Sequence, residues 1–204
     1  WVSSLMSLEK LAEDFAAAEN AARADLLLKM NGTDAVALAR SLKDLCVDAW
    51  GGDTARIFRA AEAGDFLAAY TSSSEVRAYA DWIGGHASLL HGEMREALEF
   101  LDRAVAGFKS LDQLQTAAYV QVLRLYPLAS LNRFEEAINT GVDTRDTLLS
   151  GGEIAAVGKV ELNMGNLYWL RDQFDEAEKF YRSARMRFLE TREEKLLTQC
   201  ENSL

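Results

Sequence analysis

Proline, long apolar runs and dense basic clusters are all scarce in this chain of 204 residues. Pro127 is the only proline, and there are 13 glycines. Because few residues would interrupt a helix, and alanine, leucine, glutamate and arginine are common, the composition favours helices almost throughout. Hydrophobic residues make up 49% of the chain, which argues against disorder. The length fits one or two ordinary domains or a short repeat array.

The charge balance disfavours two classes of partner. The formal net charge is −10, and the sequence has no dense run of lysine and arginine. Nucleic acid binding needs a basic surface, so we expect no nucleic acid partner, and the same charge disfavours anionic membranes. No apolar run approaches the roughly 20 residues that span a bilayer, and the N-terminus lacks the layout of a signal peptide. We therefore expect a cytoplasmic protein.

Cysteines are also few, and the ends of the chain are unusual. Cys46 and Cys200 are far apart and match no spacing of paired metal ligands, so we expect two reduced thiols. The chain opens on Trp1 rather than methionine and stops at Leu204, inside a predicted helix. We expect it to be a piece of a longer protein.

A regular repeat organises the second half of the chain. Ala97, Ala137 and Ala177 recur at every fortieth position, and the residues around them keep step. The matching positions are Met94, Phe134 and Phe174 three before the alanine, Ala104, Thr144 and Ala184 seven after it, and Phe108, Leu148 and Phe188 eleven after it. These offsets lie on one face of an α-helix, and three returns at one period indicate an array of like units.

Each unit is predicted to contain an earlier helix as well. Apolar segments at 75–91, 114–131 and 154–171 end just before a short turn that leads to the alanine-bearing helix. Helix, short turn, helix is the αα-hairpin. A small residue such as Ala177 lets the two helices lie close, because a bulky side chain there would overpack them at a cost of about 1–3 kcal/mol. We expect three units, at 75–111, 114–151 and 154–191.

The third unit resembles a tetratricopeptide repeat. Within residues 165–184, "GNLYWLRDQFDEAEKFYRSA", the residues on that family's small-or-large pattern are Gly165, Tyr168, Phe174, Ala177, Tyr181 and Ala184. The first unit matches at Gly85, Gly92, Ala97 and Ala104, whereas the second departs from the pattern at Leu125, Gly141 and Thr144. The usual unit is about 34 residues, so HEAT and armadillo repeats, at about 40–47, are the competing interpretation. The long period resembles arrays in large bacterial multidomain proteins.

The resemblance implies an all-α fold, an α-α superhelix or solenoid of antiparallel helix pairs. The three repeats would cover residues 75–191, and residues 192–204 would form the first helix of a fourth, truncated repeat. Residues 1–74 are predicted to hold helices near 5–29, 34–49 and 53–69. We interpret 34–69 as a diverged helix pair and the first helix as a cap on the array.

The sequence predicts no catalytic, cofactor-binding or metal-ligating residue. His86 and His91, the only histidines, would point in different directions from a helix. The acidic pair Glu135 and Glu136 lies at a predicted helix start, where carboxylates complement the helix dipole. The glycines at 150–153 lack the Lys-Ser or Lys-Thr of a phosphate loop. We therefore expect a protein that is not an enzyme and needs neither cofactor nor metal.

In the resembled family the first helices line a concave groove, and its inward positions can be carried over to this chain. They are Tyr79, Trp82, His86 and Leu89 in the first unit, Tyr119, Val122, Tyr126 and Ala129 in the second, and Lys159, Leu162, Asn166 and Trp169 in the third. An aromatic wall suits an apolar or helical protein segment. Aromatic residues at helical spacing are equally typical of a core, so both interpretations stay open.

Two functions are compatible with such a groove. The first is a non-catalytic scaffold for protein–protein interaction, which binds a peptide or helical segment of another protein in the aromatic groove. The alternative is a regulatory arm of a larger multidomain protein, a peptidase or transcriptional regulator, in which the groove holds a segment of its own chain. The sequence specifies neither the partner nor the oligomeric state.

Overall fold

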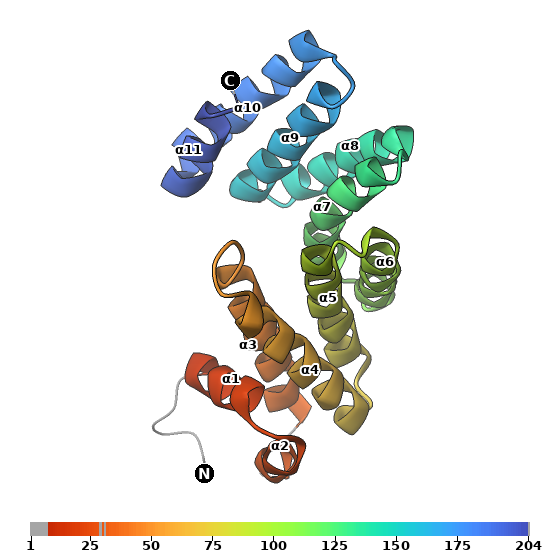
Figure 1. Ribbon diagram of the computed structural model, residues 1–204, viewed down its shortest axis with the longest axis vertical. Helices are drawn as coiled ribbons and strands as arrows, with labels where there is room; N and C mark the ends of the chain where they lie inside the picture. The colour runs from red at the N-terminus through yellow and green to blue at the C-terminus, as the bar shows by residue number, and fades with distance from the viewer. Residues whose placement is uncertain (1–7, 29, 31, 204) are drawn as a thin grey trace. The chain divides into compact units, whose positions relative to one another are not determined.

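A computed structural model of the protein describes residues 8–28, 30 and 32–203 (Figure 1). Within these residues the chain forms eleven α-helices and no β-strand, which confirms the predicted all-α class. The helices are α1 Leu8–Ala17, α2 Asn20–Leu27, α3 Gly32–Asp48, α4 Thr54–Thr71, α5 Ser74–His91, α6 Met94–Ser110, α7 Leu114–Ser130, α8 Phe134–Ser150, α9 Ile154–Trp169, α10 Phe174–Thr191 and α11 Glu194–Glu201.

The helices belong to two compact units. Residues 1–111 form the first and contain α1 to α6, and residues 112–204 form the second and contain α7 to α11. Within each compact unit, the helices from α3 onward pack against the next helix in sequence, as expected for consecutive helix pairs. The division lies between the first two predicted repeats, 75–111 and 114–151, whose bounds stay a prediction.

The helices follow a regular half-period. From α4 to α11 a new helix begins at every twentieth position, from Thr54 to Glu194. Helix α3 begins at Gly32, 22 residues before α4, so it lies outside this spacing, and the diverged pair at 34–69 stays a prediction. From α4 onward, forty residues therefore consist of two helix-and-turn segments of equal length.

A residue with left-handed backbone precedes each of the last seven helices by two positions. These residues are Ser72, Gly92, Asp112, Asn132, Gly152, Asp172 and Arg192, with φ between 51° and 77°. At five of the turns the following amide donates a hydrogen bond to the carbonyl five residues earlier, for example Gln173 N to Tyr168 O at 3.0 Å. This is the bond of the Schellman motif, which satisfies a carbonyl at the end of the preceding helix.

The N-terminal helices differ from the prediction. The sequence predicts one helix near 5–29, but the described part of this segment holds α1 and α2 as separate helices. The side chain of Arg23 explains the break, because its Nε donates to Phe15 O at 3.0 Å and its Nη2 donates to Ala16 O at 3.1 Å. Carbonyls near the end of α1 are thus bonded by a side chain instead of by a continuing helix.

Small residues allow the helices of each pair to approach closely. Ala97, Ala137 and Ala177 are all buried, as the repeat pattern predicts. A Cβ atom on Gly165 of α9 would overlap the ring of Tyr181 on α10. A Cβ atom on Gly85 of α5 would lie 2.6 Å from a methyl carbon of Leu101 on α6. Glycine is therefore required here for space, in the middle of a helix.

We expect Arg192→Gly to raise the free energy of unfolding by about 1 kcal/mol, because a side chain costs roughly that much in the left-handed region. Arg192 is exposed at φ 59°, so the substitution removes no buried contact. Gly92→Ala, at φ 77°, is the matched control and should lower stability by about the same amount. Urea denaturation measures both changes, and equal stability of Arg192→Gly and the parent protein would contradict the prediction.

We expect Gly165→Ala to destabilise the protein by about 1 kcal/mol, since overpacking against Tyr181 outweighs the gain in helix propensity. Gly64→Ala in α4 is the matched control. A Cβ atom there would meet its nearest neighbour, a carbon of Ile83, at an ordinary 3.4 Å. That variant should gain up to about 1 kcal/mol from helix propensity. Thermal melting followed by circular dichroism compares the two, and a stabilised Gly165→Ala variant would refute the packing argument.

Candidate functional site

Three of the four groove residues predicted in the first repeat are buried, and Leu89 is half-buried. Tyr79, Trp82 and His86 expose 3%, 7% and 5% of their surfaces. Helix α3 packs on this side of α5: Arg40 Nε donates to the Tyr79 hydroxyl at 3.1 Å, and Lys43 Nζ lies 5.3 Å from the centre of the Trp82 ring. In this repeat the core interpretation of the aromatic stripe therefore holds, and these side chains offer little surface to a partner.

His86 is held as a neutral ring. Neither ring nitrogen has a hydrogen-bond partner, and the ring of Trp50 packs edge-on with its centre 5.3 Å away. Burial, with a smaller contribution from the charge of Lys43, lowers the pKa of His86 to about 4. Among the described residues, no group of three histidine, cysteine, aspartate or glutamate side chains is placed to hold a metal ion. His86 therefore fills space in the core.

Four of the predicted groove residues are exposed, all of them in the second compact unit. Tyr126 exposes 58% of its surface and Trp169 exposes 55%, and both Lys159 and Asn166 are exposed. They lie on α7 and α9, which pack against each other. We call Tyr126, Lys159, Asn166 and Trp169 the α7/α9 face. The Tyr181 hydroxyl donates to Asn166 Oδ1 at 2.9 Å, which orients the amide and turns its NH2 group away from that bond.

The other four predicted residues of this compact unit do not belong to the α7/α9 face. Leu162 is buried in a cluster of α9, α10 and α11, and Val122 and Ala129 are buried as well. Tyr119 is half-buried and donates its hydroxyl to the carboxylate of Glu153. Burial, together with that hydrogen bond and the charge of Glu153, raises the pKa of Tyr119 to about 12. The carried-over positions of α7 and α9 are therefore divided between core and surface.

Additional apolar surface lies beside Trp169, and the repeat pattern did not indicate it. Leu170 and Phe174 expose 53% and 54% of their surfaces around the turn from α9 to α10. The pattern placed Phe174 on the packed face of its helix, whereas in the structure it is the first residue of α10 and more than half exposed. Trp169 and Phe174 form part of the wall of a pocket of about 220 Å³.

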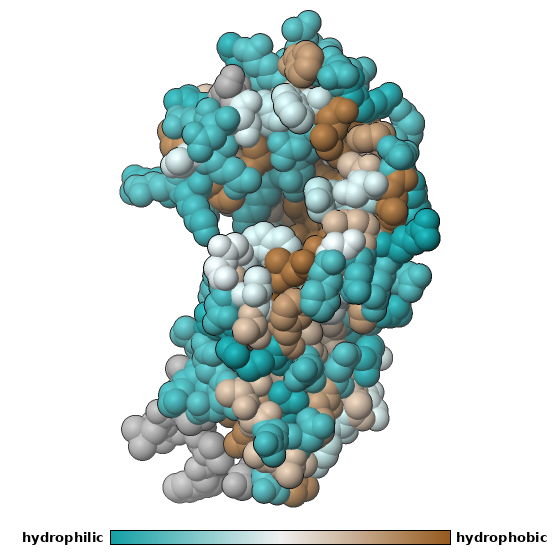
Figure 2. All heavy atoms as spheres, in the orientation of Figure 1, coloured by the Kyte–Doolittle hydropathy of each residue, from teal (hydrophilic) through white to brown (hydrophobic). Residues whose placement is uncertain are grey.

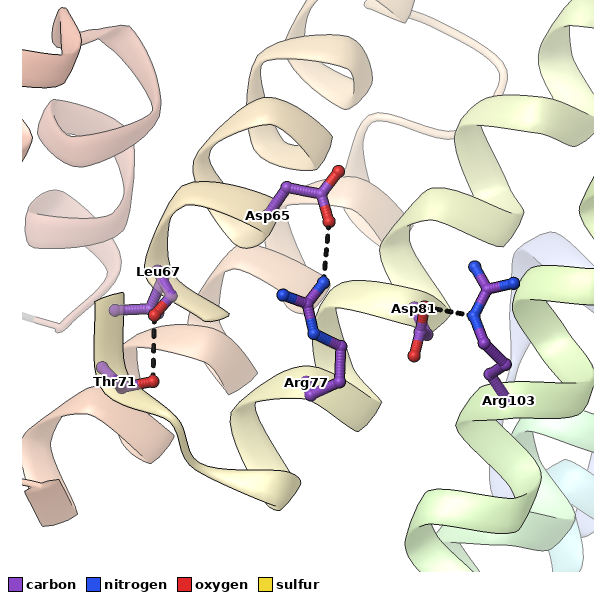
Figure 3. A network of polar contacts seen from close by, with 6 residues as sticks. All are labelled: Asp65, Leu67, Thr71, Arg77, Asp81 and Arg103. Carbon is purple, nitrogen blue, oxygen red and sulfur yellow. Dashed lines mark hydrogen bonds and ion pairs between the residues drawn. The ribbon is translucent and has the colours of Figure 1, made fainter. Parts of the chain in front are cut away.

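The first compact unit has a polar pocket of about 430 Å³, which Ser72, Arg77, Asp81 and Arg103 help to line. Figure 3 shows that Arg103 faces Asp81 and that Arg77 faces Asp65, with donor–acceptor distances of 3.0 Å and 3.2 Å. Burial raises the pKa of Asp81, and Arg103 opposes that shift. Both arginines of the lining are thus already paired with a carboxylate, Arg103 with Asp81 in the lining and Arg77 with Asp65 outside it.

The exposed surface is otherwise mixed. On the face seen in Figure 2, hydrophobic side chains lie in small patches among hydrophilic ones. None of the helices in the described part of the chain combines the length and the apolar character needed to cross a membrane. The α7/α9 face, with the apolar residues next to Trp169, is therefore the candidate site.

A search against protein-family models and a search of curated proteins both returned no match for this chain. The likeness to tetratricopeptide repeats thus rests on the residues named above, and the functional argument rests on the geometry of the α7/α9 face.

We expect acidification to destabilise the protein through His86. Its pKa is about 4 in the folded state and about 6.5 in the unfolded state, so between these values only the unfolded chain takes up the proton. Above pH 6.5 the group is neutral in both states, and as the pH falls toward 4 stability drops by up to about 3 kcal/mol. Urea denaturation at pH 7 and pH 4.5 measures this loss.

The chain offers a matched control, because His91 is exposed and His86 is buried. The loss of stability between the two pH values should shrink in His86→Leu and stay the same in His91→Leu. An unchanged loss in His86→Leu would show that other groups dominate the acid sensitivity.

Proposed function

We propose that the chain is a non-catalytic scaffold for protein–protein interaction, and that it holds a peptide or helical segment of another protein against the α7/α9 face. The exposure of Tyr126 and Trp169 carries this proposal. More than half of each side chain is open to solvent on two helices that pack together. Tyrosine and tryptophan contribute most of the binding energy at many interfaces, because each buries a large apolar area with little loss of conformational entropy.

The polar members of the face define which segments would fit. The Lys159 ammonium group favours an acidic group on the partner, and the Asn166 amide can donate to a carbonyl or carboxylate while Tyr181 holds its oxygen. The two rings supply the apolar contact area. A segment that combines apolar side chains with an acceptor group therefore matches the face better than a purely charged one.

The resemblance to long-period tetratricopeptide arrays of large bacterial proteins gives separate support. In that family these register positions line the groove that holds a protein segment. Here four of them, and none from the first repeat, are exposed. We accordingly assign the interaction to the second compact unit alone, in a cytoplasmic protein, and we infer a single short segment as its ligand.

We expect Tyr126→Ala to weaken the binding of such segments by about tenfold or more, the effect of losing a central aromatic contact. The probes are peptides selected from a displayed random-peptide library against the whole chain. Because Tyr126 is 58% exposed, the melting temperature should change little. Met186→Ala, at a 63% exposed residue outside the face, is the matched control and should bind like the parent. Selected peptides that bind Tyr126→Ala at full strength would refute the assignment.

A further inference from the structure

A buried carboxylate recurs at one register position, and in the second compact unit an arginine pairs with it. Asp81 of α5 and Glu161 of α9 are two periods apart, and they are 4% and 3% exposed. Glu161 has two partners on α10. Its carboxylate accepts a hydrogen bond from Ser183, and the Nε atom of Arg187 lies 3.6 Å from a carboxylate oxygen. In this copy the chain therefore places its own guanidinium group against the carboxylate.

In the first compact unit one of these two partners is missing. Asp81 accepts a hydrogen bond from Arg103 Nε at 3.0 Å, and Arg103 holds the register position of Ser183. The register position of Arg187 is held by Gly107, which lines the polar pocket of about 430 Å³ together with Asp81. Figure 3 shows the other carboxylate oxygen of Asp81 pointing away from Arg103. This carboxylate thus has one partner on α6, where its counterpart has two on α10.

Helix packing prevents α6 from supplying the second partner at position 107. A Cβ atom on Gly107 would lie 2.9 Å from the Cβ atom of Ala78 on α5, which is too close for packed side chains. At the equivalent contact of α9 and α10 the glycine lies on the other helix. There a Cβ atom on Gly158, the register position of Ala78, would lie 3.0 Å from the Cβ atom of Arg187. Because α6 carries the glycine, a second partner for Asp81 comes from outside the chain.

The charges and helix ends around the pocket favour a cation. Asp65 of α4 holds the register position of Arg145 of α8, so a carboxylate lies in the first copy where the second has an arginine. Burial raises the pKa of Asp81, and Asp65 adds to that rise, whereas Arg145 opposes the rise that burial causes in the pKa of Glu161. Helices α4 and α6 end beside the pocket and α5 begins there. Two helix ends with free carbonyl groups therefore outnumber one with free N–H groups.

We propose that this pocket binds a guanidinium group, which pairs with Asp81 as Arg187 pairs with Glu161. The volume of about 430 Å³ lies within the roughly 300–1,000 Å³ of typical ligand sites, so a whole arginine side chain fits. A guanidinium group has five N–H donors, and serine hydroxyls at 72–74 and at Ser110 line the pocket as acceptors beside the carboxylate. The site lies in the first compact unit, apart from the α7/α9 face, so it does not rest on the proposed function.

The test titrates an isotope-labelled sample of the whole chain with N-acetyl-arginine amide, which presents the side chain without charged ends. Two-dimensional NMR should show saturable shifts of the amide signals of Ser73 and Gly107, which line the pocket. N-acetyl-citrulline amide has nearly the same shape but no charge, and it should bind about tenfold more weakly or worse, because it forms no ion pair with the carboxylate. Equal affinity of the two compounds, or no saturable shift with the arginine compound, would overturn the inference.

Variants of the chain locate the site. Asp81→Asn removes the charge at nearly constant shape and should weaken the arginine compound by about tenfold or more. Glu161→Gln is the matched control, because it removes the equivalent buried charge from the other compact unit and should leave the affinity unchanged. Circular dichroism checks that both variants are folded. Full binding by a folded Asp81→Asn variant would overturn the site.

A second variant fills the pocket from within. Ala78→Gly combined with Gly107→Arg rebuilds on α5 and α6 the contact that Gly158 and Arg187 make on α9 and α10. The new guanidinium group should pair with Asp81 and abolish binding of the arginine compound, while Ala78→Gly alone should keep it. A folded double variant that binds at full strength would contradict the proposal.

Two further ligands distinguish the sources of the guanidinium group. Free arginine adds a charged amino group and a carboxylate, whereas a peptide with one internal arginine adds backbone on both sides. Tighter binding of free arginine than of N-acetyl-arginine amide would support a small-molecule ligand, and tighter binding of the peptide would support an arginine of a partner protein. Loss of binding to Asp81→Asn in the tighter case would confirm that the same pocket is used.

Discussion

The left-handed residue two positions before each of the last seven helices is the constraint on which the rest of this structure depends. It reverses the chain, and at most of the turns the next amide reaches back to a carbonyl five residues earlier, so each helix ends and the next begins at a fixed distance. Helices therefore start at every twentieth position from α4 onward. Equal spacing brings equivalent positions of successive helices side by side. Tyr126 and Asn166 hold the same register position one repeat apart, on α7 and α9, which pack against each other.

Much of this fold could be predicted from the sequence, because the alanines of the close contacts are easy to recognise. The recurrence of Ala97, Ala137 and Ala177 predicts both the helix pairs and their period. The half-period could not be predicted in the same way. Glycine marks a left-handed turn plainly at Gly92 and aspartate marks one weakly at Asp172, but Arg192 adopts the same backbone without a compositional signal. Local hydrogen bonds close those turns, from Gln173 N to Tyr168 O and from Glu193 N to Phe188 O, both at 3.0 Å.

The site shows a different limit of sequence analysis. His86 and Asn166 hold the same register position two periods apart, and one is buried while the other is exposed. Trp50 packs edge-on against His86, with ring centres 5.3 Å apart, whereas the residue two periods after Trp50 is Ser130, which has no ring. Periodicity identifies which positions line the inner side of the first helices. For His86, burial depends on the ring of Trp50, a residue almost one full period earlier in the chain, which periodicity alone does not indicate.

A buried polar position in the first helices links the packing to the α7/α9 face. Asp81 and Glu161 occupy one register, and burial raises the pKa of each. Each meets an arginine of the next helix, with the Nε atoms of Arg103 and Arg187 at 3.0 Å and 3.6 Å from a carboxylate oxygen. The net stabilisation of such pairs is small, because desolvation offsets the attraction.

These ion pairs instead favour one alignment of each helix along the next. If α10 slid along α9 by one turn, the buried Glu161 carboxylate would lose its contacts with Ser183 and Arg187 of α10, which is unfavourable. In the observed alignment the Tyr181 ring packs on Gly165. Its hydroxyl then donates a hydrogen bond to the side chain of Asn166, the residue that follows Gly165. The Glu161–Arg187 ion pair and the packing of Tyr181 on Gly165 thus belong to one helix alignment, and the same alignment orients a polar group at the surface.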